Sequence, residues 1–340
     1  MELSKLIELG IAAATKENIP AEYTLADVNE TLREELKAYN DYSYYRAHKL
    51  DLFSLIEQVA NVVVPRKVRE QFGAFAEVQH VNNGEKLVFK QRTGVSRGKN
   101  FVTRAAEYGT YRTFNLDSKD ITMNPRVYAG AAILELGDFL CGRVDMAELM
   151  DIILEGLSDS IYNEVQNALV ATFNDDEMPA NNKGEAAGFD ATVMDRIISS
   201  VEAYGESVTI YCTKAFASKM YNVPGFVGNA TPTTALQDFV DVRERGFIGK
   251  YKGCDIVLLK QSFEDEENTE KVVKEEYAYI MPAGREKPVK IGIEGGTLVD
   301  EQRLQDGSFE VSAQHMFDVA VVRKNYWGIY KDTELEPASI

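Results

Sequence analysis

The stretch from residue 145 to residue 173 constrains the fold of this chain more than any other feature. Its apolar side chains recur every three or four positions, and they are Met146, Leu149, Met150, Ile153, Leu157, Ile161, Val165, Ala168, Leu169 and Phe173. This is the period of an amphipathic α-helix, and the acids Asp145, Glu148 and Asp151 stand in its first turns, where the helix dipole favours negative charge. At 1.5 Å per residue such a helix is ~44 Å long. We therefore expect a long helix that acts as the backbone of a thin, flat subunit.

Between residues 72 and 136 the pattern changes to short β-favouring runs separated by turn residues. We expect strands over residues 76–81, 86–90, 108–116 and 127–134. The tripeptide Asn82-Asn83-Gly84 is typical of a hairpin turn, because glycine adopts a positive φ without strain. The polar segment 93–100 has almost nothing to bury, so we expect it to be the tip of an extended β-hairpin loop. Arms of about 15 residues at about 3.3 Å each would reach ~50 Å, far enough to touch a neighbouring subunit.

Residues 1–50 predict a mostly helical arm. Apolar side chains at helical spacing indicate two helices that are separated at Pro20, the second of them capped at Asn29 or Thr31. The arm ends in a dense tyrosine cluster, which consists of Tyr39, Tyr42, Tyr44 and Tyr45. An exposed aromatic patch is typical of a contact surface, whereas a buried packing edge is the alternative. We take Tyr42, Tyr44 and Tyr45 as candidate contacts between subunits.

The C-terminal half mixes helices and strands. After a polar loop over 174–188, Asp190 and Thr213 are predicted to cap two helices, with a strand over 207–212 between them. A strand, a tight turn and a second strand are expected over 246–255. Further strands are expected over 255–259, 276–281, 287–293 and, as one long element, 308–330. The order of elements therefore predicts an α+β fold with an α/β region in its second half.

Charge is distributed very unevenly along the chain. The segment Gly84–Arg126 holds nine Lys/Arg and four acids, a net charge of +5, whereas the whole chain carries −17. Complementary surfaces on one molecule favour head-to-tail association of copies. We take as candidate contact residues the basic side chains Lys86, Lys90, Arg92, Arg97, Lys99 and Arg104. The overall acidity argues against a protein that coats nucleic acid.

No pattern in the chain indicates an enzyme, a metal or a cofactor. The segment 93–100 lacks the glycine spacing and the Ser/Thr of a phosphate-binding loop. The three histidines and the three cysteines are scattered, without the spacing of a zinc site, and the cysteines are expected to be reduced thiols. A solvated loop explains the acidic run at 264–270 better than a calcium site does. No signal peptide or transmembrane run is present in the sequence.

The order of these elements resembles the major capsid proteins of tailed bacteriophages, which have the Hong Kong 97-like fold. The resemblance runs over about residues 30–332, and it rests on four stretches: Arg143–Glu148, Gly246–Asp255, Met281–Gly284 and Gly295–Thr297. It is a likeness of pattern and includes no catalytic signature. The same fold occurs in encapsulin nanocompartments.

This resemblance implies a division of the chain. Residues 1–50 would be the N-terminal arm and 75–127 the extended loop. The peripheral domain, with its spine helix at about 145–173, would comprise 51–74, 128–175 and 301–332. An axial domain over 176–300 and a tail over 333–340 would complete the subunit. No large scaffolding segment is expected ahead of these elements, since the strand and helix signals begin early in the chain.

The resemblance also implies a structural function. Many copies would assemble as pentamers and hexamers into an icosahedral shell that encloses double-stranded DNA without sequence-specific binding. A separate scaffolding protein, a portal and a decoration protein are the further partners implied, and the shell would be assembled in the host cytoplasm. Some relatives cross-link a loop lysine to an asparagine. Here Lys86, Lys90 or Lys99 with Asn325 would be the pair, and we do not expect the reaction, because nothing in the sequence indicates a desolvated lysine.

Two other functions remain open at this point. One is an encapsulin-like compartment, which would enclose a protein cargo instead of a genome. The other is a soluble α/β enzyme with an unrecognised site, which would form a discrete small oligomer and would be stabilised by a ligand.

Overall fold

The computed structural model describes residues 3–15, 24–93, 117–135, 137–138, 141, 143, 146–203, 207–220, 249–261, 263, 271–283, 287–305, 307–322 and 325–335. They fall into two compact units. Unit 1 consists of Met1–Leu87, Thr122–Tyr162 and Ile291–Val319. Unit 2 consists of Val88–Ile121, Asn163–Lys290 and Ala320–Ile340. Within the described ranges, no helix has both the length and the apolar character that crossing a membrane requires.

The N-terminal part of unit 1 is a group of packed helices. They are α1 (Leu3–Thr15), α2 (Leu25–Leu36), the 3-10 turn η1 (Lys37–Asn40) and α3 (Tyr42–Phe72). The cap predicted for α2 at Asn29 or Thr31 was wrong. The helix begins at Leu25, five to seven residues before the position predicted, because Thr24 and Asp27 form a reciprocal capping box. Pro20 lies outside the described residues.

Helix α3 is the longest helix of the described chain, with 31 residues, and the sequence pattern did not predict it. Its apolar side chains include a β-branched run followed by Pro65, which is typical of strands and breaks but is tolerated here inside the helix. The long helix expected over 145–173 is confirmed as α5 (Met146–Phe173). The two helices meet in unit 1, where the rings of Phe72 and Tyr162 lie 5.0 Å apart.

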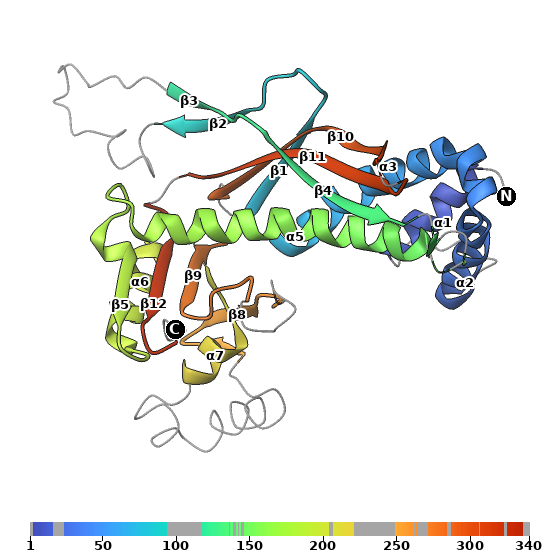
Figure 1. Cartoon of the computed structure of the whole chain (residues 1–340). Coiled ribbons are helices and arrows are strands. Elements are labelled where there is room, and N and C mark those ends of the chain that lie inside the picture. Colours follow the sequence, from blue (N-terminus) through green and yellow to red (C-terminus); the bar gives the residue numbers. More distant parts are fainter. Residues whose placement is uncertain are drawn as a thin grey trace. The chain divides into compact units, whose positions relative to one another are not determined.

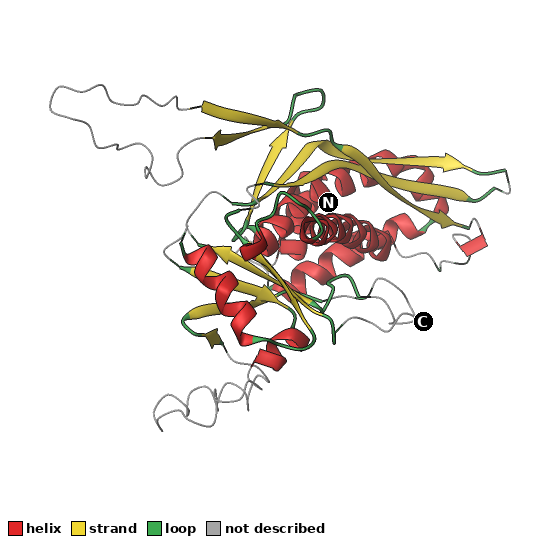
Figure 2. Ribbon diagram, turned by 90° about the vertical axis from the view of Figure 1, so that its left-hand side faces the viewer, coloured by secondary structure: helices red, strands yellow, loops and turns green. Residues whose placement is uncertain are grey.

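Unit 1 contains a four-stranded sheet in the order β1-β10-β11-β4. Its strands are β1 (Ala76–Val81), β10 (Val289–Arg303), β11 (Phe309–Val321) and β4 (Arg126–Leu134). β4 is an edge strand that pairs antiparallel with β11, with Gly130 opposite Ala313. Helices lie along one face of this sheet, and among the described residues none covers the other face (Figures 1 and 2).

The Asn82–Gly84 turn has the positive φ expected of it, 82° at Gly84. The hairpin predicted around it was wrong, because β1 and the following strand β2 (Val88–Thr93) belong to different sheets. The turn is held instead by β10, whose Glu294 carboxylate accepts the Gly84 N–H at 2.8 Å. β2 pairs with β3 (Asp117–Thr122) in a separate two-stranded sheet. The loop tip and the strand predicted over 108–116 lie outside the described residues.

Side chains of α3 bind the backbone of β10 in a regular ladder. Asn61 Oδ1 accepts the Thr297 N–H at 2.6 Å, and Glu57 Oε1 accepts the Val299 N–H at 2.8 Å. Four residues of a helix rise ~6 Å and two residues of a strand ~6.6 Å, so the two spacings match. At the next step along β10, Glu301 accepts hydrogen bonds from α3. We call these contacts the α3–β10 ladder. Its first two steps provide side-chain acceptors for the N–H groups of Thr297 and Val299, and its last step joins side chains of the helix to the Glu301 carboxylate.

Unit 2 is built on a six-stranded mixed sheet in the order β5-β12-β9-β6-β8-β7. The strands are β5 (Lys183–Ala186), β12 (Gly328–Asp332), β9 (Tyr277–Pro282), β6 (Val208–Cys212), β8 (Cys254–Leu258) and β7 (Lys250–Tyr251). Helices α6 (Ala191–Glu202) and α7 (Lys214–Met220) bury their apolar sides in the core of this unit. The short 3-10 turn η3 (Ala180–Asn182) leads into β5.

Several sequence predictions for unit 2 are confirmed by local contacts. Asp190 caps α6 by accepting the Thr192 N–H at 2.8 Å, and Thr213 caps α7 through the Phe216 N–H at 3.3 Å. The turn between β7 and β8 is as expected. Two predictions were wrong. Residues 308–330 form two strands, β11 and β12, which belong to different sheets, and the loop predicted over 174–188 contains η3 and the edge strand β5, which pairs with β12.

Candidate interaction surfaces

The tyrosine cluster divides between the surface and the interior. Tyr44 is 40% exposed and stacks on His48 at 4.4 Å between ring centroids, while the Tyr39 ring meets it edge-on at 5.1 Å. Tyr42 is half-buried, 5.9 Å from the ring of Phe309. Tyr44 therefore remains available for contact with another molecule, and Tyr42 is available only in part.

The candidate contact role of Tyr45 was wrong, because this side chain is only 1% exposed. Its hydroxyl donates to Glu301 Oε2 at 2.8 Å, and Lys49 Nζ lies 3.2 Å from the same oxygen. Burial, and then the hydrogen bond to Glu301, raises the pKa of Tyr45 above its usual range. Tyr45 is thus the last step of the α3–β10 ladder, and its role is internal.

The basic candidates are only partly described. Lys86 and Lys90 are exposed, on the turn before β2 and on β2 itself. The backbone of Arg92 belongs to β2, while Arg97, Lys99 and Arg104 lie outside the described residues. Sequence reasoning did not single out Lys290, which is 1% exposed with its Nζ 5.7 Å from the centroid of Phe89. A cation buried against a ring contributes to packing and does not form a contact surface.

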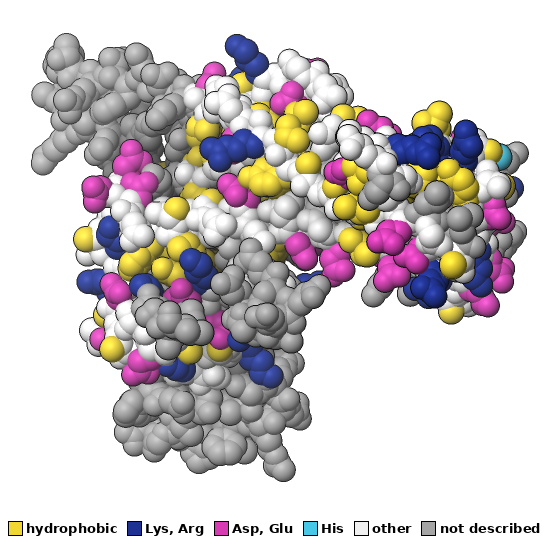
Figure 3. Space-filling model, viewed as in Figure 1, with side chains coloured by type: hydrophobic (Ala, Val, Ile, Leu, Met, Phe, Trp, Pro, Cys, Tyr) yellow, Lys and Arg dark blue, Asp and Glu magenta, His cyan; other side chains and the backbone are white. Residues whose placement is uncertain are grey.

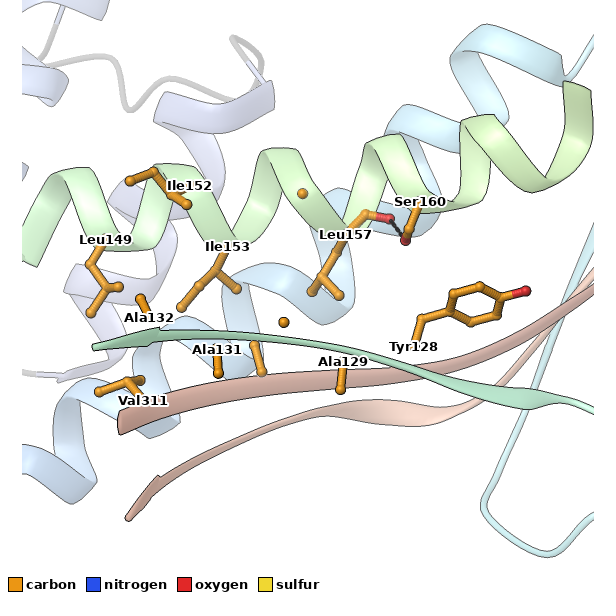
Figure 4. A pocket seen from close by; sticks show the side chains of 13 residues that line it. Tyr128, Ala129, Ala131, Ala132, Leu149, Ile152, Ile153, Leu157, Ser160 and Val311 are labelled. Carbon is orange, nitrogen blue, oxygen red and sulfur yellow. Dashed lines mark hydrogen bonds between the residues drawn. The ribbon is translucent and has the colours of Figure 1, made fainter. Parts of the chain in front are cut away.

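An apolar groove in unit 1 lies between α5 and the edge strand β4. Its volume is about 300 Å³, and Figure 4 shows its lining of small and aliphatic side chains. β4 contributes Tyr128 to Ala132, and α5 contributes several turns that include Ile152 and Gly156. Ile152 is 57% exposed, and Ile133 at the end of β4 is 63% exposed. Apolar surface left open in this way is typical of a site of association.

The helix beside this groove is acidic. α5 contains five acids and no Lys or Arg. Glu148, Asp151, Glu155 and Asp159 recur at three- and four-residue spacing, so they form one row along the helix, next to Ile152. On the face drawn in Figure 3, hydrophobic side chains lie among charged ones of both signs.

Two of the titratable groups with shifted pKa values, Cys212 and His315, are buried inside the described chain. No group of three or more His, Cys, Asp or Glu among the described residues could hold a metal ion. Burial raises the pKa of the Cys212 thiol to about 12, which keeps it protonated and unreactive near neutral pH. His315, 1% exposed, has Nδ1 3.1 Å from Thr297 Oγ1, and burial, together with the nearby His80, lowers its pKa to about 4.

Solved structures identify the fold. The chain is similar to the capsid of the cyanophage P-SCSP1u, with a TM-score of 0.50 and 12% identity over 77% of this chain and 87% of that chain. It is similar to the capsid of the Helicobacter pylori bacteriophage KHP30, with a TM-score of 0.50 and 10% identity over 77% and 90%. The capsid of a native GTA particle matches with a TM-score of 0.50 and 11% identity over 77% and 89%. The fold is therefore the Hong Kong 97-like fold of phage capsid proteins.

The family follows from the sequence itself. Residues 6–331 match the family described as "SPbeta prophage-derived putative capsid protein YonB". The chain belongs to this YonB family, and it is a structural protein of a phage capsid. No curated protein sequence matches the chain.

Proposed function

We propose that many copies of this capsid protein assemble, as pentamers and hexamers, into an icosahedral shell that encloses the double-stranded DNA of a tailed phage. The observation that carries the proposal is the match of residues 6–331, nearly the whole chain, to a capsid family. Repetition of one contact set in closed symmetry makes a shell stable although each contact is modest. The virion capsid is then the location of the protein, after assembly in the host cytoplasm.

The charge distribution supports this function. A subunit with a net charge of −17 makes a wall that does not hold the genome by electrostatic attraction. The basic segment Gly84–Arg126 is then free to contact acidic surfaces of neighbouring copies. The exposure of Lys86, Lys90 and Tyr44 supports a part for these three side chains in the contacts.

The division into arm, extended loop, peripheral domain and axial domain belongs to the same proposal. Helix α5 takes the place of the spine, and the six-stranded sheet with α6 and α7 takes the place of the axial domain. A scaffolding protein, a portal and a decoration protein complete the set of partners. The role is structural and includes no catalytic step.

Electron microscopy of the expressed chain, with size-exclusion chromatography alongside, tests the function. We expect closed shells, or rings of five or six subunits. A monomer or dimer that stays unassembled even with its scaffolding protein would contradict the proposal. Shells that contain a cargo protein and no DNA when isolated from phage-producing cells would favour the encapsulin-like alternative.

The role of the basic segment has its own test. Reversal of charge at Arg92, Arg97 and Lys99 should abolish shells while the subunit keeps its circular dichroism spectrum. The matched control reverses Lys5, Arg69 and Lys214, three exposed cations outside the segment, and should still assemble. Normal shells from the first triple variant would contradict a contact role for the segment.

A further inference from the structure

The described surface of unit 1 carries a second exposed apolar site, near the start of α3. Leu50 is 74% exposed, the largest exposed fraction among the large hydrophobic side chains of the described chain. Arg46 and Ala47, four and three residues before it, are exposed on the same side of the helix. We call Arg46, Ala47 and Leu50 the α3 knob. It presents one apolar side chain flanked by one cation.

The groove between α5 and β4 has the complementary chemistry. Its lining includes the exposed Ile152, which lies four residues after Glu148 and three before Glu155. An apolar surface is therefore flanked by acids, as the knob is flanked by a base. Small side chains leave the volume of about 300 Å³ open, enough to receive side chains of the size of leucine.

Three charged groups at the two sites are free of ion pairs among the described residues. Arg46, Glu148 and Glu155 make no ion pair in the described part of the chain. In contrast, the neighbouring Lys49 is engaged with Glu301, so it belongs to the internal ladder. The two sites carry opposite charges beside exposed apolar side chains. Such complementarity favours a contact between molecules and makes the contact specific.

We propose that the α3 knob of one copy docks in the α5–β4 groove of a second copy. Leu50 enters the apolar groove beside Ile152 and Gly156, and Arg46 lies against the acidic row at Glu148 and Glu155. The two surfaces are different, so the contact is heterologous: each copy offers a knob to one neighbour and a groove to another. Such contacts propagate around a ring or between rings, as a shell requires. This inference rests on the proposed shell-forming function and names one of its contacts.

A cysteine cross-link between separately labelled copies tests the contact directly. One protein carries Leu50→Cys and the other Ile152→Cys, both with Cys141→Ser to remove the exposed native thiol. The two are co-assembled and oxidised, and the disulfide-linked dimer that contains both labels is quantified. The control replaces the first partner with Val62→Cys, since Val62 is exposed on the same helix but outside the knob. We expect at least tenfold more mixed dimer from the Leu50 pair than from the Val62 pair.

A charge exchange keeps the test independent of cysteine chemistry. Arg46→Glu and Glu148→Arg should each lower the yield of shells at least fivefold, and the two together in one chain should restore most of it. Arg69→Glu, a matched reversal elsewhere on α3, should leave the yield unchanged. Shells that form without the mixed cross-link, or a double variant that assembles no better than either single one, would overturn the docking inference alone. Wild-type protein that forms no shells with its scaffolding protein would overturn the proposed function and the docking together.

Discussion

The two larger sheets of the molecule differ in how completely their own chain covers them. In the six-stranded sheet, β9 is buried at all but its last position, and the edge strands β5 and β7 are only 4 and 2 residues long. In the four-stranded sheet, the edge strand β4 has 9 residues, and none of them is fully buried. Among the described residues, the first sheet has a buried central strand and short edges, whereas the second leaves an apolar edge and a groove open.

The residues of β4 sharpen this contrast. Soluble proteins protect long edge strands with charges, proline or bulges. After Arg126, the strand from Val127 to Leu134 contains only apolar side chains, glycine and one tyrosine. Such a strand would promote aggregation in a protein that stays monomeric, and it is suited to a subunit whose edges are covered on assembly.

The largest effect is expected from a cavity in the six-stranded sheet. Ile210→Ala removes a side chain of β6 that is 0% exposed, and it should lower the free energy of unfolding of unit 2 by about 3 kcal/mol. Chemical denaturation followed by the fluorescence of Trp327, the single tryptophan, reports on this unit. A decrease of less than about 1 kcal/mol in the free energy of unfolding would contradict the view that the core of unit 2 stabilises this sheet without other subunits.

The second largest effect is expected from acid, which should destabilise the four-stranded sheet. His315 is buried in its neutral form, and its pKa is lowered to about 4 from the usual 6.5. Between these two pH values the unfolded chain binds a proton at His315 and the folded chain does not, so acid favours the unfolded state. Stability is full above pH 6.5 and should fall by about 2–3 kcal/mol as the pH drops towards 4. Hydrogen exchange of unit 1 amides between pH 4 and 7 measures this. His315→Gln should flatten the dependence, and an unchanged slope in that variant would refute the assignment.

The α3–β10 ladder should contribute a smaller amount. Asn61→Ala leaves the N–H of Thr297, a residue 1% exposed, without its acceptor, and should cost about 1–3 kcal/mol. Gln58→Ala is the control, since Gln58 bonds Ser54 at the helix surface, and it should cost less than about 0.5 kcal/mol. Thermal unfolding followed by circular dichroism compares them. Equal losses of stability in the two variants would show that the ladder does not stabilise the subunit.

The smallest effect on the free subunit is expected at the open edge. Ile133→Ala, at a side chain 63% exposed, should change subunit stability by less than about 0.5 kcal/mol. Its effect should appear in assembly, as a lower yield of shells in sedimentation. A large loss of subunit stability would mean that β4 is already covered within one chain.

Much of the fold could be predicted where local rules and tertiary context agree. The spacing of apolar residues located α5, and the caps at Asp190 and Thr213 located α6 and α7. Helix α3 was missed because its Val62–Pro65 run has strand propensity and a breaker, while contacts with α1 and β10 hold it helical. Such tertiary override is not visible in a local pattern.

The candidate contacts show the same limit. Tyr44 and Tyr45 are neighbours in sequence with equal propensities, yet the helix turns one to solvent and the other towards Glu301, 256 residues away. The groove could not be predicted either, because it joins β4 to a helix that follows it and depends on small side chains whose positions only the fold defines.

Hydrogen–deuterium exchange, measured on free subunits and on assembled shells, tests the central contrast most directly. We predict that amides of β4 and of the first half of α5 gain protection on assembly, while those of β6 and β9 are already protected in the free subunit and change little. Shells in which β4 exchanges as fast as in the free subunit, or in which β9 gains as much protection as β4, would contradict the account.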